Sequence, residues 1–462
     1  MLAGLVGRCL DSDDLNNLLG DVNHWYQDRG YTTTRIYAQE QDLAKGKLEL
    51  RVIPGRVGVY RYLEREGDSR LFSAFPGRSG DLLNLRDLEQ GLENLNRTPS
   101  QESKFKLYPG KAPGVSDVVV ELAEKPRWRI TELLDNSGTK SMGVWRSNTE
   151  FAFDNLLGRN DLLSLGYNRN IDNGQMDAAF EGLTFNYFIP SGYHLFGLSA
   201  ATFASEFNLP GINQSYAMRT HSQKMGASYE YLFSRDQSSK FSLISGLDFT
   251  EQHTHIAQIE IDSQYRRLSV LYLGLKGKQY FGNAVFDWQT RVDQGVPFFG
   301  AMATIPGGSE PRYTLVKAHA SFSLPLWGEQ ALWRTSISGQ AGEEKLPSLA
   351  QLYLGNRYNV RGFQDNSLYS STGICWRNDL EAKALRWGDI SLIPYAGLDA
   401  GLVKPQAAQQ VSQHKLAGMA LGLRGQYGKA GFDIAYTRAL SRPDEFAAES
   451  KTRWLASLNL AF

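Results

Sequence analysis

The chain has 462 residues, which is too long for one compact core and predicts two or three domains. The formal net charge is zero and the pI is near 7.1, so the charge balance gives no indication of a nucleic-acid partner. Mean hydropathy is −0.37, and no window approaches roughly 18 continuous apolar residues, which excludes a membrane-spanning helix. A membrane protein of this composition must therefore be a closed β-barrel, whose alternating strands average out in hydropathy.

The amino terminus, Met1 to Cys9, lacks the charged start and the long apolar run of a signal peptide. A barrel of this type must be exported, so we expect a mature chain from which an amino-terminal piece is absent. The two cysteines, Cys9 and Cys375, lie too far apart in the expected layout to pair. Cys9 is interpreted as a small buried hydrophobe, or as half of a disulfide whose partner lay upstream.

The first predicted element is a helix between Asp11 and Gly30, in which apolar residues recur three or four positions apart. Asp11 or Ser12 can cap its start, and the glycine can end it. Two strand-like runs follow, the second of which alternates cleanly up to Val52 and ends in a Pro-Gly pair. Residues 1–54 are therefore predicted to form a small α+β domain whose opening strand and helix are missing.

The same kind of unit appears again, and in full, over residues 55–125. Its predicted elements are a strand at 57–63, a short helix at 71–75, a helix with Leu85, Leu88, Leu92 and Leu95 on one face, and strands at 104–108 and 117–122. Generic small α+β modules would show the same pattern of strand, two helices and two strands. The segment that follows the unit in the chain therefore decides its interpretation.

Beyond Glu124-Lys125-Pro126 the helical periodicity stops, and about sixteen alternating segments of roughly ten residues continue to the end of the chain. Each has one apolar face and one face that carries charge, as where Phe151 and Phe153 oppose Arg146 and Glu150. A soluble sandwich would have to bury these charges in its core. Residues 126–462 are therefore predicted to form a transmembrane all-β barrel, apolar outside and charged inside.

Two short stretches stand out within the barrel pattern: residues 354–363, in a turn-rich segment, and the Gly-Leu-Asp-Ala-Gly run at 397–401, in a strand. Period two directs the apolar residues of that strand to lipid and Asp399 to the lumen. Small residues on both sides of the acid leave room for another group to reach it. A lone carboxylate in a crowded lumen needs a cation or donors, and the planar fork of Arg361 suits it.

A Val-Arg-Gly-Phe loop followed by a Gly-x-Asp-x-Gly strand resembles the outer-membrane superfamily of barrel-assembly insertases and two-partner secretion (TpsB) transporters. The residues that carry the resemblance are Val360, Arg361, Gly362 and Phe363 in the loop and Gly397, Asp399 and Gly401 in the barrel wall. The resemblance implies that a loop at about 342–371 folds back into a barrel of about sixteen strands. It also implies that Arg361 pairs there with Asp399.

The resemblance extends to both ends of the chain. Because they precede a barrel, the modules at 1–54 and 55–125 resemble POTRA domains. The terminal aromatic residue of the last alternating strand, Phe462, is similar to the signal by which barrel proteins are recognised for insertion. Two POTRA-like units, rather than three or five, favour a TpsB transporter over an insertase.

The resemblance implies a pore in the bacterial outer membrane, with its POTRA domains in the periplasm, that secretes a large partner exoprotein. That partner would carry an amino-terminal secretion domain and would be a contact-dependent inhibition toxin or a haemolysin-like adhesin. POTRA-like units suit the capture of an unfolded chain by strand addition. The other implied partners are outer-membrane lipid and the barrel-assembly machinery that inserts this chain, which we expect to be a monomer.

Other functions fit the sequence less well. An insertase for other barrels belongs to the same superfamily, and a passive porin would have neither POTRA units nor a motif loop. No enzyme, cofactor or metal site is expected, because the sequence has no Gly-x-x-x-x-Gly-Lys-Ser/Thr loop and no Gly-x-Ser-x-Gly elbow. His253 and His255 lie on one face of a predicted strand, with no Cys, Asp or Glu ligand cluster expected around them, and are interpreted as an exposed polar pair.

Overall fold

The computed structural model describes the chain apart from residues 1–6, 8–10, 43–45, 65–68, 303–309 and 408, so Cys9 lies outside the described residues. The chain divides into two compact units. Unit 1 comprises Met1–Arg127, Asp154–Asp161 and Ile189–His194, and unit 2 comprises Trp128–Phe153, Leu162–Phe188 and Leu195–Phe462. Among the described helices, none combines the length and the apolar character needed to cross a bilayer.

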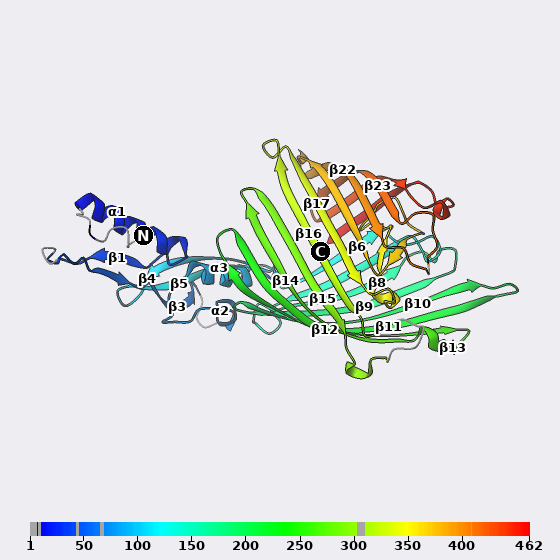
Figure 1. Cartoon of the computed structure of the whole chain (residues 1–462), viewed down its shortest axis with the longest axis horizontal. Coiled ribbons are helices and arrows are strands. Elements are labelled where there is room, and N and C mark those ends of the chain that lie inside the picture. Colours follow the sequence, from blue (N-terminus) through cyan, green and yellow to red (C-terminus); the bar gives the residue numbers. More distant parts are fainter. Residues whose placement is uncertain (1–6, 8–10, 43–45, 65–68, 303–309, 408) are drawn as a thin grey trace. The chain divides into compact units, whose positions relative to one another are not determined.

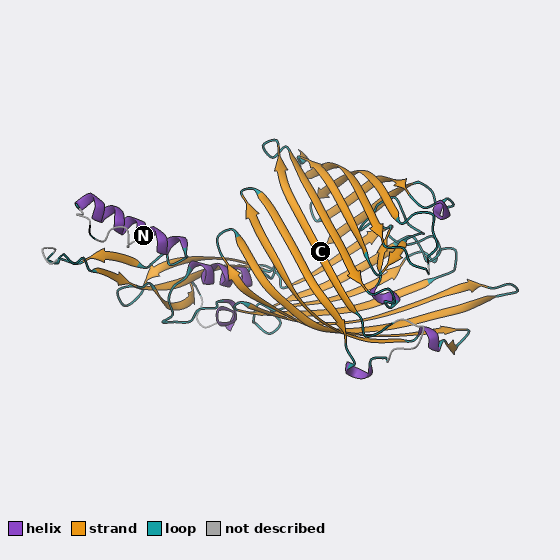
Figure 2. Ribbon diagram, in the orientation of Figure 1, coloured by secondary structure: helices purple, strands orange, loops and turns teal. Residues whose placement is uncertain are grey.

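Unit 1 contains the helices and short strands that were predicted to precede the barrel in the sequence (Figure 2). In chain order they are α1 (Ser12–Asp28), β1 (Arg35–Ala38), β2 (Leu50–Ile53), β3 (Arg56–Tyr62), α2 (Ser69–Ala74), α3 (Leu85–Leu95), β4 (Gln101–Pro109) and β5 (Val115–Glu124). Strands β1 and β2 form a two-stranded antiparallel sheet. The other three form a sheet in the order β3-β5-β4, with β3 parallel to β5.

Local capping explains where α1 begins and ends. The Asp11 carboxylate accepts the backbone N–H of Asp14 at 2.8 Å, and Asp14 returns the contact in a capping box. The chain leaves the helix through Gly30, whose φ of +89° lies in the left-handed region. The Gly30 carbonyl then accepts the backbone N–H of Leu85 at 2.8 Å. A β-carbon at Gly30 would lie 2.2 Å from Oδ1 of Asn84, so this junction requires glycine.

The core of unit 1 joins the three-stranded sheet to α2 and α3. Its buried apolar residues are Val57, Tyr62, Leu71, Ala74, Phe75, Leu83, Leu88, Leu95, Val118 and Val120. The two helices approach closely because α3 presents Gly91 to the ring of Phe75. A β-carbon on Gly91 would lie only 2.0 Å from Cδ1 of that ring, so the site is already filled.

We expect Gly91→Ala to destabilise unit 1, although alanine is the better helix former. The intrinsic gain is about 1 kcal/mol, whereas overpacking a filled core costs about 1–3 kcal/mol. Gly20→Ala in α1 is the matched control, because nothing lies within 4 Å of a β-carbon there and the substitution should stabilise the helix. The measurement is urea unfolding of the whole chain in detergent, followed by helical circular dichroism. Equal shifts of the midpoint in both variants would contradict the packing argument.

Unit 2 is a closed antiparallel barrel in which sixteen long strands, counted over the described residues, follow one another in chain order (Figure 1). They are β6 (Trp128–Asp135), β7 (Arg146–Asp154), β8 (Leu162–Asn170), β9 (Ala179–Ser191), β10 (His194–Pro210), β11 (Ser215–Arg235), β12 (Ser239–Ile256), β14 (Arg266–Phe281), β15 (Ala284–Gly295), β16 (Thr314–Leu326), β17 (Ala331–Gly342), β20 (Gly373–Ala382), β22 (Ile390–Val403), β23 (Lys415–Tyr427), β24 (Ala430–Ser441) and β25 (Thr452–Ala461). The prediction of about sixteen strands is confirmed.

Two short strands accompany the barrel without interrupting it. They are β13 (Ile259–Glu260), which pairs with β12, and β21 (Leu385–Trp387), which pairs with β22. The long strands on either side still pair directly, β12 with β14 and β20 with β22. The barrel closes where β25 pairs with β6, over a register that runs from Ser457↔Asp135 to Ala461↔Thr131.

Over the described residues, the two faces of the barrel wall largely follow the predicted alternation, but some charges lie on the outward face, as where Glu251 of β12 and Arg267 of β14 share the face of Phe249 and Leu271. On β22, Leu398 is exposed on the outward face, whereas its neighbour Asp399 is buried on the lumen face. Register with Thr149 of β7 places Glu132 of β6 on the outward face, so the expectation that charges point inward is wrong there. The Glu132 carboxylate accepts hydrogen bonds from the hydroxyls of Ser147 and Thr149, which compensate its charge locally.

Candidate functional site: a loop held in the barrel lumen

The segment between β17 and β20, residues 343–372, is called the motif loop below. It contains a 3-10 turn (Ser348–Ala350) and a small hairpin of β18 (Leu352–Leu354) and β19 (Leu368–Ser370). Its apolar residues Leu354, Val360, Phe363 and Leu368 form one buried cluster with Cys375, Val403, Leu416, Ala439 and Phe446 from the wall and a neighbouring loop. The motif loop is therefore a packed element of the barrel interior.

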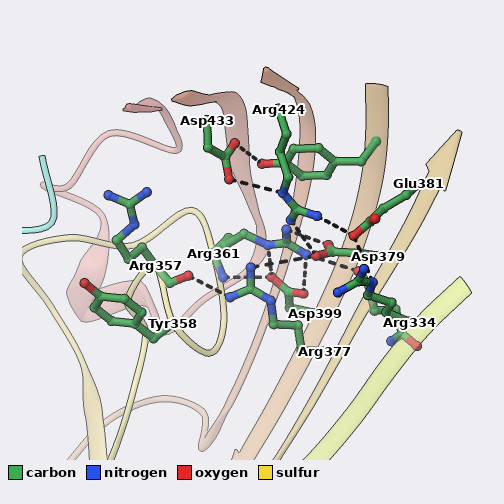
Figure 3. A network of polar contacts seen from close by, with 12 residues as sticks. Arg334, Arg357, Tyr358, Arg361, Arg377, Asp379, Glu381, Asp399, Arg424 and Asp433 are labelled. Atoms are coloured by element: carbon green, nitrogen blue, oxygen red, sulfur yellow. Dashed lines mark hydrogen bonds and ion pairs between the residues drawn. The ribbon is translucent and has the colours of Figure 1, made fainter. Parts of the chain in front are cut away.

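Two side-chain hydrogen bonds join Arg361 of the motif loop to Asp399 of β22. Nε donates to Oδ2 and Nη2 donates to Oδ1, each at 2.7 Å (Figure 3). The backbone N–H of Arg361 donates to the same Oδ2 at 3.0 Å. The Arg361 side chain is 1% exposed and the Asp399 side chain 0%. A guanidinium that meets a carboxylate with two parallel bonds forms one of the strongest polar contacts in proteins.

A second acid, which sequence reasoning missed, contacts the same guanidinium. Nη1 of Arg361 lies 2.7 Å from Oδ1 of Asp379 on β20, as an ion pair without hydrogen-bond geometry. Asp379 also accepts from Arg424 at 3.1 Å, and Arg424 reaches Glu381 and Asp433 as well. Alternation along β20 places Asp379 and Glu381 on the lumen face, but no periodicity shows that Asp379 reaches the motif loop.

Glycines allow the motif loop to approach the wall this closely. A β-carbon on Gly397 would lie 2.1 Å from Nη2 of Arg361, and one on Gly401 would lie 2.7 Å from a leucine of the loop. Gly418 on β23, which sequence reasoning missed, faces the loop backbone, and its β-carbon would lie 1.8 Å from the carbonyl oxygen of Arg361. Gly362, the next residue of the loop, has a φ of +101°, which disfavours any other residue.

The motif loop also bridges the seam between the first and last barrel strands. Nη1 of Arg357 lies 3.5 Å from Asp135 of β6 and donates to the carbonyl of Ala456 of β25 at 3.3 Å. Nη1 of Arg453, also on β25, donates to the carbonyl of Phe363 at 2.6 Å. Because the β25–β6 register covers five residue pairs, these contacts support the seam where the backbone ladder is short.

Glu449, between β24 and β25, holds the chain just after the Val-Arg-Gly-Phe run. Its Oε1 accepts the backbone N–H groups of Gln364 at 2.5 Å and Asp365 at 2.9 Å, and its Oε2 accepts from Nδ2 of Asn366 at 3.1 Å. Glu449 is buried, and hydrogen bonds to an ionised acceptor are roughly twice as strong as neutral ones. The motif loop is thus held by Arg361 on one side of Phe363 and by Glu449 on the other.

Glu449→Gln should loosen the motif loop without removing the buried ion pair, because the amide accepts backbone hydrogen bonds more weakly than the carboxylate. Cys375 is buried in the apolar cluster that it forms with the motif loop, so the accessibility of its thiol measures how tightly the loop is held. In a Cys9→Ser background, we expect faster labelling by a membrane-impermeant maleimide. Glu445→Gln is the matched control, because that exposed carboxylate binds a serine of the β22–β23 loop instead. Equal labelling rates in the two variants would mean that Glu449 does not restrain the loop.

The last residue of the chain and the predicted histidine pair lie outside the motif loop. The backbone N–H of Phe462 donates to the carbonyl of Ile130 at 2.9 Å, and its ring is exposed. Two carboxylates lie beside His253: Glu260 at 2.6 Å, because β13 folds back onto β12, and Glu251 of β12 itself at 3.6 Å. Over the described part of the chain, no group of three His, Cys, Asp or Glu residues could hold a metal ion.

Comparison with known protein families decides where the chain belongs. Residues 114–425 match the family described as haemolysin secretion/activation protein ShlB/FhaC/HecB. The chain is a member of this haemolysin secretion/activation family. Residues 1–55 match a ShlB-type POTRA domain and residues 61–109 match a POTRA domain, so the family's periplasmic modules are present as well. The porin alternative, which predicts no POTRA units, is therefore wrong.

Individual relatives cover nearly the whole chain. Outer membrane transporter CdiB-2 of Burkholderia pseudomallei (strain 1026b) is 31% identical over an alignment of 455 residues that covers 96% of this chain and 77% of the relative. Hemolysin transporter protein ShlB of Serratia marcescens is 27% identical over 100% of this chain and 82% of its own length. The solved structure of CdiB from Escherichia coli has a TM-score of 0.94 at 26% identity, over 100% of this chain and 86% of that one.

These similarities confirm the predicted class and location of the protein. Members of the haemolysin secretion/activation family are outer-membrane transporters that act with a secreted partner protein, and this chain is one of them. Its barrel lies in the bacterial outer membrane and its POTRA domains lie in the periplasm. The family consists of transporters and not of enzymes.

Proposed function

We propose that the motif loop controls passage of one large exoprotein through the barrel lumen. The observation that best supports this is the buried pair of Arg361 and Asp399, which holds a packed loop inside the barrel through contacts that can break and form again. A permanently open channel would have no use for such a restraint. The pair therefore holds the motif loop in its working position between rounds of transport.

The POTRA sheet would receive the unfolded exoprotein by strand addition. In the described part of unit 1, the order β3-β5-β4 leaves β3 and β4 at the edges of the sheet. Edge strands offer unpaired backbone groups to an extended chain and make little demand on its sequence. The energy for transport would then come from folding of the exoprotein outside the cell, since the sequence offers no phosphate-binding loop for a nucleotide.

The identity of the cargo is part of the same proposal. The exoprotein carries an amino-terminal secretion domain and is a contact-dependent inhibition toxin or a haemolysin-like adhesin. The higher identity to CdiB-2 than to ShlB, 31% against 27%, favours the first of these two classes. The pore itself works as a monomer, and its terminal Phe462 directs the barrel-assembly machinery to insert it into outer-membrane lipid.

Co-expression with candidate large exoproteins tests this proposal. We expect one of them to appear at the cell surface, as detected by antibody labelling of intact cells, and its version without the secretion domain to stay in the periplasm. Loss of other barrel proteins from the outer membrane on deletion of the chain, with no exoprotein secreted, would instead favour an insertase. Steady high conductance in planar bilayers without any secretion would contradict a gated pore.

A further inference from the structure

The lumen contains an arginine that the motif loop restrains but that the buried ion pair does not use. Arg377 on β20 stands directly opposite Asp399 on β22 in the strand register, so both side chains point into the lumen. Its Nη1 donates to the carbonyl oxygen of Arg357, in the motif loop, at 2.7 Å (Figure 3). Its Nη2 lies 4.0 Å from Oδ2 of Asp379, which is the limit of an ion pair. Arg377 is therefore held by the loop backbone.

If the motif loop left the lumen, the negative charges of Asp379 and Asp399 would not be compensated equally by nearby arginines. Asp379 would keep its contact with Arg424, whose Nη2 donates to Oδ2 of Asp379 at 3.1 Å. Asp399, in contrast, takes its charged hydrogen bonds from Arg361 alone among the described residues. A carboxylate on the lumen wall that loses its cation is destabilised, strongly in a dry site and less where water reaches it. Arg357 and Arg361 belong to the same loop, so the movement that removes the cation also removes the carbonyl that holds Arg377.

We propose that Arg377 takes over Asp399 when the motif loop leaves the lumen. Directly opposed residues of antiparallel strands have Cβ atoms about 4.5–5.5 Å apart, a gap that an arginine side chain spans without backbone motion. Arg377 is thus a positioning residue, which lowers the barrier to loop release by pairing the carboxylate again. The inference rests on the proposed function in one respect, that loop departure is a step of transport. The exchange of partners can be tested without any exoprotein.

A double-mutant cycle on the purified full chain tests the exchange. R361A imitates the departure of the guanidinium, and R377Q removes its replacement. With Arg361 present, R377Q should lower the apparent unfolding temperature by no more than about 2 °C; in R361A it should lower that temperature by about 5 °C or more. The temperature is read from the heat-dependent shift of the barrel in SDS gels. Equal effects of R377Q in the two backgrounds would overturn the proposal.

Two further substitutions, R291Q and D399N, separate the exchange from a general loss of stability. Arg291 is a lumen arginine that binds buried Asp293 at 2.9 Å in another cluster, so R291Q should have the same effect with and without R361A. If R361A/R377Q fails to fold, addition of D399N should restore folding, because an amide needs no cation. In R361A/D399N, R377Q should have no added effect. Failure of D399N to rescue the double variant would count against the exchange.

Discussion

Reversing either charge of the buried pair, in R361D or D399R, should abolish secretion of the partner exoprotein. R361D would face two carboxylates, those of Asp399 and Asp379, at positions that now lie 2.7 Å from the guanidinium. Breaking a buried pair costs on the order of 3–5 kcal/mol in a dry site, and less if water reaches it. The assay is surface exoprotein for each folded pore in the outer membrane. Normal secretion by both variants would show that the pair has no functional weight.

The charge-swapped variant R361D/D399R should recover only part of the secretion. It restores one ion pair, but the carboxylate introduced at position 361 remains beside Asp379. Adding D379N removes that repulsion, so the triple variant should secrete more than the double. The control is K404E, which reverses one member of an exposed pair with Glu344 and should leave secretion unchanged. Identical secretion by the double and triple variants would remove Asp379 from the mechanism.

The second large effect is expected from a single methyl group, in Gly418→Ala. The new β-carbon would lie 1.8 Å from the carbonyl oxygen and 2.9 Å from the carbonyl carbon of Arg361. Both are backbone atoms, so the motif loop must move away from the wall and weaken its contacts with Asp399. A cost of about 1–3 kcal/mol corresponds to a fall of roughly 5–150-fold in the ratio of docked to undocked loop. We expect secretion to lose its control or to stop, while the barrel itself still folds.

Labelling of Cys375 in a Cys9→Ser background distinguishes a displaced loop from a damaged barrel. We expect much faster maleimide labelling in Gly418→Ala, because the buried thiol shares its apolar cluster with the loop. Gly431→Ala on β24 is the matched control. Its β-carbon would meet only the end of a flexible glutamine side chain, at 3.0 Å, before contacts of 3.8 Å. Slow labelling in Gly418→Ala, equal to that in Gly431→Ala, would show that the loop tolerates the methyl group.

Together, these variants change the stability of the docked motif loop relative to the undocked one. The pair of Arg361 and Asp399 is buried and joined by two parallel hydrogen bonds, which favours a docked loop, whereas the exchange proposed for Arg377 would favour its release. Glu449 and Arg357 anchor the same loop through contacts with the β24–β25 loop and the barrel seam. A transporter needs a loop that both docks and leaves. A loop that never left the lumen would block export, and a loop that never docked would leave the membrane permeable.

Local signals in the sequence were sufficient for the helices and for most faces of the strands. The three-four spacing and the acidic cap of α1 act within a few residues, and Asp11, one of the two predicted caps, is the N-cap and forms a capping box with Asp14. Period two follows from the pleat of a strand, so it places Asp399 on the lumen face whatever its neighbours are. The same rule failed at Glu132, where hydroxyls on the next strand satisfy an outward carboxylate. Alternation cannot show such a contact between strands.

The sequence by itself determined that an alternating barrel follows two small α+β modules, and that one arginine and one acid are suited to meet inside it. Only the tertiary structure decided what else meets there: Asp379, Gly418, Glu449 and Arg377. These residues come from strands and loops far apart in the chain. Their meeting depends on the register of each strand against the next and on how the motif loop packs in the lumen, and neither is written in the spacing of residues along one strand.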